Sequence, residues 1–310
     1  MSCRLFCQGS ENFINLDAVF SYMIISFYNH KGGVGKTTDV QILAYAFLNK
    51  GKRVLLVDLD PQQYLSLAVL PFNKFDEEIT SSYDIAVGKA PSPVSVEVFL
   101  LDDTTTTLDI IPTLEKDILL FLKQQIPQAY PTAIKDGLEG IKNKYDYIII
   151  DLPPQVTMPT WWGLVASDFV IVPITLSDYS QYGSYTYVGY ILPYITKITK
   201  VKTLGFLLSN VSVRDPEFVY QMVSRDLEDY TRKVFSQYPE LLSYIYKEPL
   251  FKTYVQQTKE LRDQIRGRAN EVPVFHIIRK STYLPTKKLR DMLPKIAEEV
   301  EGRINNFVSL

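Results

Sequence analysis

The sequence contains only two cysteines and two histidines among its 310 residues. Cys3 and Cys7 both fall within the first ten residues, which excludes a disulfide framework and a cysteine-rich metal site in the core. Neither His30 nor His276 has a cysteine or a second histidine nearby in the sequence, so we expect no zinc-type site. A reducing, cytoplasmic setting is therefore the expectation.

Long apolar runs are also missing. No stretch approaches the roughly 20 apolar residues of a membrane-spanning helix, and residues 1–22 lack the pattern of a signal peptide. The formal net charge of -2 and the pI near 5.8 argue against nucleic-acid binding by the surface as a whole. A nucleic-acid partner would have to be bound by a local basic patch.

Short apolar segments rich in β-branched residues alternate with segments of helical period. This alternation predicts an α/β fold with a mostly parallel, twisted sheet covered by helices on both faces. We expect residues 23–310 to form one domain after an N-terminal tail at 1–22, with a loop around 71–107 and a charged helical region at about 216–270. The expected strands are Met23–Tyr28, Arg53–Asp58, Leu108–Pro112, Tyr145–Asp151, Phe169–Ile174, Thr203–Ser209 and Val272–Ile278.

A glycine-rich segment follows the first expected strand and opens a helical pattern, which is the setting of a P-loop. Glycines let backbone N–H groups face phosphates, and the helix N-terminus adds partial positive charge. We expect Lys36 to reach the β- and γ-phosphates and Thr37 to offer its hydroxyl to Mg²⁺. The segment consists of Lys31, Gly32, Gly33, Val34, Gly35, Lys36, Thr37 and Thr38.

Aspartates end two of the expected strands, at the sheet edge where α/β proteins bind ligands. Asp151 is placed to complete the Mg²⁺ shell. Asp60 lies just past the second strand and is assigned to orienting the attacking water. For Asp58 two interpretations stay open: a place in the Mg²⁺ shell, or a cap on the next helix.

These motifs, together with Ser167–Pro173, resemble the ParA/MinD group of deviant Walker A P-loop ATPases over most of residues 23–210. The resemblance implies Mg²⁺-dependent ATP hydrolysis in an ATP sandwich homodimer, with Lys31 reaching the partner's nucleotide. A cation supplied in this way acts as an arginine finger does. The resemblance also suggests Asn210 as an adenine contact, with a turn-closing asparagine as the alternative.

Three functions are compatible with this resemblance. The first is a DNA segregation ATPase for plasmids or chromosomes, which binds DNA non-specifically as an ATP dimer and is stimulated by a centromere-binding partner of the ParB type. Such a protein would be associated with the nucleoid when ATP-bound. The second is a MinD-like ATPase that binds membranes, and the third is a regulatory protein whose contacts are gated by nucleotide.

A local excess of basic residues favours DNA binding. The window from residue 247 to 290 holds eleven lysines and arginines against four acidic residues. At helical spacing, four of the basic residues would share one face, although a solvated face without a partner would look the same. They are Lys252, Lys259, Arg262 and Arg266.

Two further segments bear on partners. The chain from Leu289 onward has the pattern of an amphipathic helix whose polar face has nearly balanced charge, which favours packing on the domain over binding to a membrane. The pair Trp161 and Trp162 is compatible either with the core or with an exposed partner contact. About 22 residues ahead of the P-loop are too few for a DNA-reading domain, so we expect a partner to recognise specific sites.

Overall fold

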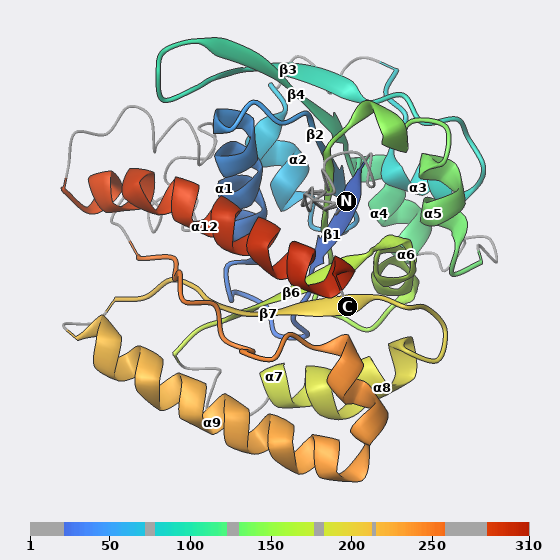
Figure 1. Ribbon diagram of the computed structural model, residues 1–310. Helices are drawn as coiled ribbons and strands as arrows, with labels where there is room; N and C mark the ends of the chain where they lie inside the picture. The colour runs from blue at the N-terminus through green and yellow to red at the C-terminus, as the bar shows by residue number, and fades with distance from the viewer. Residues whose placement is uncertain are drawn as a thin grey trace, which may run out of the picture.

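A seven-stranded sheet forms the centre of the computed structural model, which describes residues 22–71, 78–122, 130–176, 183–212, 215–257 and 284–309 (Figure 1). The strand order is β3-β4-β2-β5-β1-β6-β7, and only the edge strand β3 runs antiparallel to its neighbour. The strands are β1 (Met23–Phe27), β2 (Val54–Asp58), β3 (Val94–Phe99), β4 (Thr105–Ile111), β5 (Tyr147–Asp151), β6 (Phe169–Ile174) and β7 (Lys202–Leu208).

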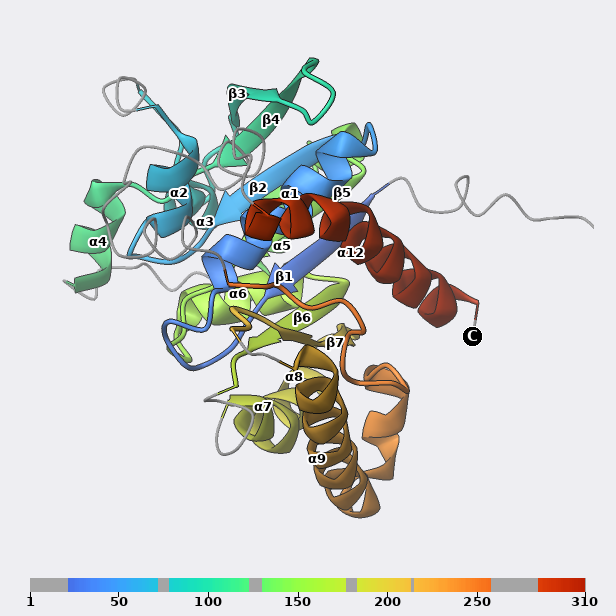
Figure 2. The same ribbon diagram turned by 90° about the vertical axis from the view of Figure 1, so that its left-hand side faces the viewer.

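Helices cover both faces of the sheet, so the core has two halves (Figures 1 and 2). One half lies between the sheet and α1 (Lys36–Asn49), α2 (Tyr64–Val69) and α12 (Leu284–Val308). The other lies between the sheet and the set α3 (Ser82–Ala86), α5 (Ala133–Leu138), α6 (Met158–Ala166), η4 (Tyr187–Ile191), α8 (Leu192–Ile195), α9 (Pro216–Gln237) and η5 (Pro239–Tyr244). Three short helices complete the described elements: α4 (Glu115–Leu122), η3 (Lys142–Lys144) and α7 (Gly183–Thr186).

The predicted α/β fold is therefore confirmed, because the apolar runs without alternation are central parallel strands. Every residue of β2 and β5 is buried, as strands covered on both faces require. The strand expected at 272–278 lies outside the described residues, as do residues 1–21 of the expected tail.

The loop expected at 71–107 was wrong in its second half, which forms a β-hairpin. In β3, partly or fully buried Val94, Val96 and Val98 alternate with exposed residues, the pattern of a strand with one solvated face. Asp103, with a φ of 67°, closes the turn before β4. Most of residues 104–107 belongs to β4 itself.

Within the described part of the charged region at 216–270, the helices α9 and η5 end at Tyr244, and residues 245–257 are not helical. Residues 245–257 run beside β7, with isolated parallel bridges from Ile245 and Leu250 to that strand and from Gln256 to Val211, which follows the strand. Pro249 disfavours a helix in this segment, since proline cannot donate the hydrogen bond that a helix interior requires. The expectation that Lys252 lies on a helical face was therefore wrong.

Helix α12 packs its apolar face on α1 and the sheet, as the amphipathic pattern predicted. The buried side chains on this face are Leu289, Met292, Leu293, Ile296, Val300 and Ile304. Because the domain covers this face, the helix does not present it as an exposed membrane-binding surface.

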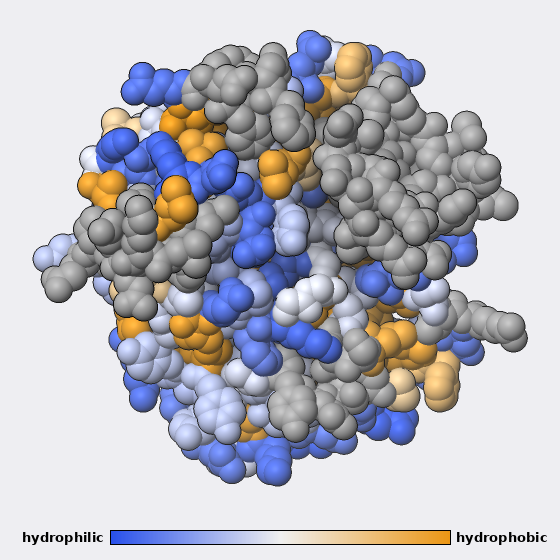
Figure 3. All heavy atoms as spheres, turned by 180° about the vertical axis from the view of Figure 1, so that it is seen from behind, coloured by the Kyte–Doolittle hydropathy of each residue, from blue (hydrophilic) through white to orange (hydrophobic). Residues whose placement is uncertain are grey.

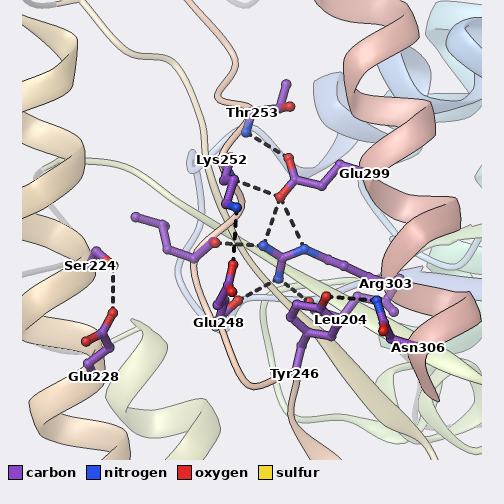
Figure 4. A network of polar contacts seen from close by, with 11 residues as sticks. Leu204, Ser224, Glu228, Tyr246, Glu248, Lys252, Thr253, Glu299, Arg303 and Asn306 are labelled. Carbon is purple, nitrogen blue, oxygen red and sulfur yellow. Dashed lines mark hydrogen bonds and ion pairs between the residues drawn. The ribbon is translucent and has the colours of Figure 1, made fainter.

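A buried arginine on α12 fastens the segment at 245–257 to β7 (Figure 4). Arg303 is 3% exposed, and its guanidinium donates hydrogen bonds to the carbonyls of Leu204 at 2.7 Å, Glu248 at 2.8 Å and Leu250 at 2.7 Å. Glu299 pairs with the same guanidinium at 2.8 Å. The pairing of β6 with β7 shifts register at Leu204. Arg303 therefore donates to a carbonyl that lies at an irregularity of the sheet.

Candidate nucleotide-binding site

The loop between β1 and α1 forms an open cradle of backbone. Gly33 and Gly35 have φ values of 78° and 97°, in the left-handed region that glycine adopts without strain. A methyl group added at Gly32 or Gly33 would meet no atom within 4 Å. No side chain caps the N-terminus of α1, so its first amides are available to an anion.

Lys36 lies inside this loop and is only 6% exposed. Its ammonium donates to the backbone carbonyls of Asn29 at 3.2 Å and Lys31 at 3.3 Å. Burial lowers the pKa of Lys36, while the nearby carboxylates of Asp151 and Asp60 raise it. Lys31, in contrast, is exposed at the start of the loop.

Asn29 braces the loop, and the sequence analysis did not identify it. The side chain is fully buried; its amide donates to the Pro173 carbonyl at 2.7 Å, and its oxygen accepts from the Lys31 N–H at 3.0 Å. A buried polar residue directly after a strand and before the glycines was the available signal.

Thr37 and Asp151, both expected to bind Mg²⁺, lie in contact. The Thr37 hydroxyl donates to Asp151 Oδ2 at 2.6 Å, across 114 residues of chain. The other oxygen, Oδ1, is buried and has no hydrogen-bond partner among the described residues. Burial raises the pKa of Asp151 to about 7, the charge of Asp60 adds to the rise, and Thr37 and Lys36 oppose it.

Asp58 and Asp60 follow β2, but they play different parts. Asp58 accepts from the Ser66 N–H at 2.9 Å, the Ser66 hydroxyl at 2.6 Å and the Asp60 N–H at 3.0 Å. Since Ser66 lies in the first turn of α2, these contacts fit the capping alternative better than a place in the Mg²⁺ shell. Asp60 accepts from the Gln62 N–H at 2.9 Å, and burial raises its pKa.

The donor set fits a magnesium ion bound together with phosphate. Mg²⁺ prefers oxygen ligands and is usually held by one or two carboxylates plus phosphates and waters, not by a full protein cage. The hydroxyl of Thr37 and the unpartnered oxygen of Asp151 supply such ligands side by side. Accordingly, the described part of the chain holds no cluster of three or more histidine, cysteine or acidic residues that could hold a metal ion.

The remaining predicted site residues are divided. Val34 is buried and Thr38 is partly buried in the first turn of α1. Asn210, two residues past the end of β7, is exposed and has a φ of 57°, which fits the turn alternative. Lys252 pairs with Glu248 at 3.4 Å. The other three DNA-binding candidates, Lys259, Arg262 and Arg266, lie outside the described residues.

A second buried pair near the loop was not predicted. The Ser209 hydroxyl, at the end of β7, donates to Asp39 in the first turn of α1. Burial raises the pKa of Asp39, and the hydrogen bond from Ser209 lowers it. The pair ties α1 to the end of the edge strand β7, and its members stand 170 residues apart in the sequence.

Comparison with known proteins identifies the family of the chain. The AAA_31 model, described as an AAA domain, matches residues 22–204. The chain belongs to this family and is a P-loop ATPase of the ParA/MinD type.

Its relatives include partition proteins. The chain is 37% identical over 166 residues to the sporulation initiation inhibitor protein Soj of Bacillus subtilis, covering 52% of this chain and 61% of Soj. It is 32% identical over 165 residues to the chromosome partitioning protein ParA of Caulobacter vibrioides, covering 52% of this chain and 58% of that protein. The matches thus span about six tenths of these relatives.

Solved structures share the fold. The structure of pNOB8 ParA superposes with a TM-score of 0.78 at 22% identity, covering 92% of this chain and 99% of that one. The same protein bound to nonspecific DNA gives a TM-score of 0.74.

Among the described residues, none of the helices combines the length and the apolar character needed to cross a bilayer.

Proposed function

We propose that the chain binds ATP with Mg²⁺, hydrolyses it, and acts as a ParA-type DNA segregation ATPase. The observation that carries this proposal is the contact of Thr37 with Asp151, beside Lys36 and the open glycine loop. It brings together a phosphate cradle, a buried cation and two oxygen ligands for a metal. Hydrolysis of ATP is the reaction that this combination serves in P-loop proteins.

The residues would divide the work as follows. Backbone amides of the loop and the first turn of α1 bind the phosphates, and the Lys36 ammonium exchanges its two carbonyl contacts for phosphate oxygens. Thr37 and Asp151 would hold Mg²⁺, which neutralises charge on the β- and γ-phosphates when bound. Asp60, held by the Gln62 N–H, orients the attacking water.

Lys31 serves a second copy of the chain in this proposal. The side chain is exposed at the rim of the loop, whereas Lys36 is buried within it. A lysine in that place is suited to reach the nucleotide of a facing protomer and to stabilise the charge that develops during hydrolysis. Dimerisation and hydrolysis are thereby coupled.

Variants of the two lysines test the nucleotide chemistry. Lys36→Ala is expected to abolish binding of a fluorescent ATP analogue. Lys31→Ala is expected to keep appreciable binding, to lose about 10³-fold or more in turnover, and to stay monomeric with ATP in sedimentation. Lys233→Ala, at an exposed site on α9, is the matched control. Normal turnover by purified Lys31→Ala would refute the assignment in trans.

DNA binding is proposed from charge and from the similarity to partition proteins. The ATP form is expected to bind arbitrary duplex DNA, with affinity falling steeply as salt rises. Arg262→Glu combined with Arg266→Glu should weaken binding equally for unrelated sequences and lower the log–log salt slope by about 0.9 for each lost contact. Unchanged binding would move the DNA surface elsewhere. A partner of the ParB type would then supply site recognition and stimulate hydrolysis.

A further inference from the structure

The helix formed by α7, η4 and α8 presents an aromatic ridge to solvent. Tyr190 is 76% exposed, Tyr194 is 55% exposed and Ile198 is 47% exposed. They stand four residues apart, and the helical hydrogen bonds continue to Thr199, so the three side chains share one face. Trp161 of α6 lies against Tyr194, with ring centroids 5.0 Å apart. These four residues are called the aromatic ridge below.

The two tryptophans of α6 thus have separate roles. Trp162 is fully buried and meets Tyr83 edge to face at 5.6 Å, which makes it a core residue. Trp161 is only partly buried and extends the ridge from a second helix. A ridge built from two neighbouring helices has a fixed shape, which lowers the entropy lost when a partner binds.

The backbone under the ridge is irregular. Residues Tyr187–Ile191 form a π-helical turn, a feature that is often found at functional sites. The Tyr230 hydroxyl donates to the carbonyl of Tyr185 at 3.0 Å, and the two rings stack at 3.9 Å. In this turn Tyr187 and Ile191 face the core, while Tyr190 faces solvent.

The segments that carry the ridge have no acidic residue, although α9, which packs beside η4, carries Asp226, Glu228 and Asp229. Residues 183–212 contain no aspartate or glutamate, and α6 has no charged residue at all. Lys197 and Lys200, close to Ile198 in the sequence, are exposed. Seen from behind, hydrophobic side chains lie in small groups among hydrophilic ones (Figure 3).

We infer that the aromatic ridge binds an amphipathic segment of another protein that carries apolar residues flanked by aspartate or glutamate. Tyrosine and tryptophan dominate the binding energy of protein interfaces, because they bury large rigid surfaces. Lysines at the rim favour an acidic partner and speed its approach. The ridge does not include the phosphate contacts, so this inference does not rest on the proposed ATPase function.

A display library of random 16-residue peptides, selected on the immobilised full chain without nucleotide, provides the probe. The selected peptides should combine apolar residues at helical spacing with an excess of acidic residues. In fluorescence anisotropy, Tyr190→Ser with Tyr194→Ser should weaken a selected peptide about tenfold or more. Lys197→Glu with Lys200→Glu should weaken it several-fold and reduce its salt dependence.

Controls separate this surface from general damage. Tyr190→Phe with Tyr194→Phe keeps the rings and should bind like the parent, and Phe218→Ser removes an exposed aromatic residue of α9 outside the ridge. Circular dichroism should be unchanged in every variant. The inference is overturned if no acidic peptide is selected, or if the serine variants bind as the parent does. It is also overturned if the serine variants instead lose binding to phosphatidylglycerol vesicles, which would indicate a lipid surface, or lose self-association, which would indicate a second copy of the chain.

Discussion

Replacing Arg303 by methionine tests whether the buried guanidinium holds α12, the segment at 245–257 and β7 together. Methionine fills similar volume without donors. The change leaves the carbonyls of Leu204, Glu248 and Leu250 without their donor and leaves Glu299 beside an apolar group. Removing one member of a buried ion pair costs about 3–5 kcal/mol.

The structure shows which groups account for this cost. Glu299 also accepts from the backbone N–H groups of Lys252 and Thr253, both at 2.8 Å, so its carboxylate keeps two donors in the variant. The cost therefore arises mainly from the three carbonyls, each about 1–3 kcal/mol if it stays dry. We expect the free energy of unfolding to fall by about 3–5 kcal/mol, a large share of a typical total.

Urea unfolding at pH 7, with the slope m compared between variants, measures this loss. Arg303→Lys keeps the charge but has a single ammonium in place of the fork, so its stability should be intermediate. Hydrogen exchange at the amides of Phe251 and Val255, which donate to β7, should rise in Arg303→Met before global unfolding. A loss below about 1 kcal/mol, with protected amides, would refute the reasoning.

Three further variants address other parts of the molecule. Asp60→Ala should trap an ATP dimer by removing the group that orients water; a monomer with ATP in sedimentation would instead indicate a structural role. Gly163→Ala should destabilise the packing of α6 by about 1–3 kcal/mol, because its Cβ would lie 2.2 Å from Leu152 Cδ2, and wild-type stability in urea would contradict this. Burial raises the pKa of Asp84, but hydrogen bonds from two lysines lower it to about 2. The pKa of Asp84 in the folded state is thus below its value near 4 in the unfolded state. The Asp84→Asn variant should therefore be less stable than the parent by about 1 kcal/mol above pH 4, and this difference should vanish as the pH falls through 2. A difference that does not depend on pH would argue against the ion pairs.

The parts of the site that could be predicted are those that depend on residues next to one another in the sequence. The glycine loop needs its residue types in fixed order, and the Asp151 strand is an unbroken apolar run ending in a carboxylate. Parallel strands bring such ends to one edge of the sheet, so Thr37 and Asp151 could both be selected from local patterns, and the structure places them in contact.

The parts that were missed depend on contacts between distant segments. The segment at 245–257 has neither alternation nor helical period, because it is held by hydrogen bonds to β7 and by Arg303, 99 residues away from Leu204. The bond between Ser209 and Asp39 likewise joins residues whose proximity only the finished sheet creates. Propensity carries no information about such pairs.

The surroundings of Gly205 restrict which residues position 205 can accept during evolution. Gly205 has a φ of 141°, and a methyl group there would lie 2.4 Å from the Pro249 carbonyl oxygen and 2.6 Å from Arg303 Nη1. Loss of the arginine would remove only one of these two obstructions and would not relieve the backbone. Homologues are therefore expected to keep glycine at 205 whether or not they carry the arginine at 303.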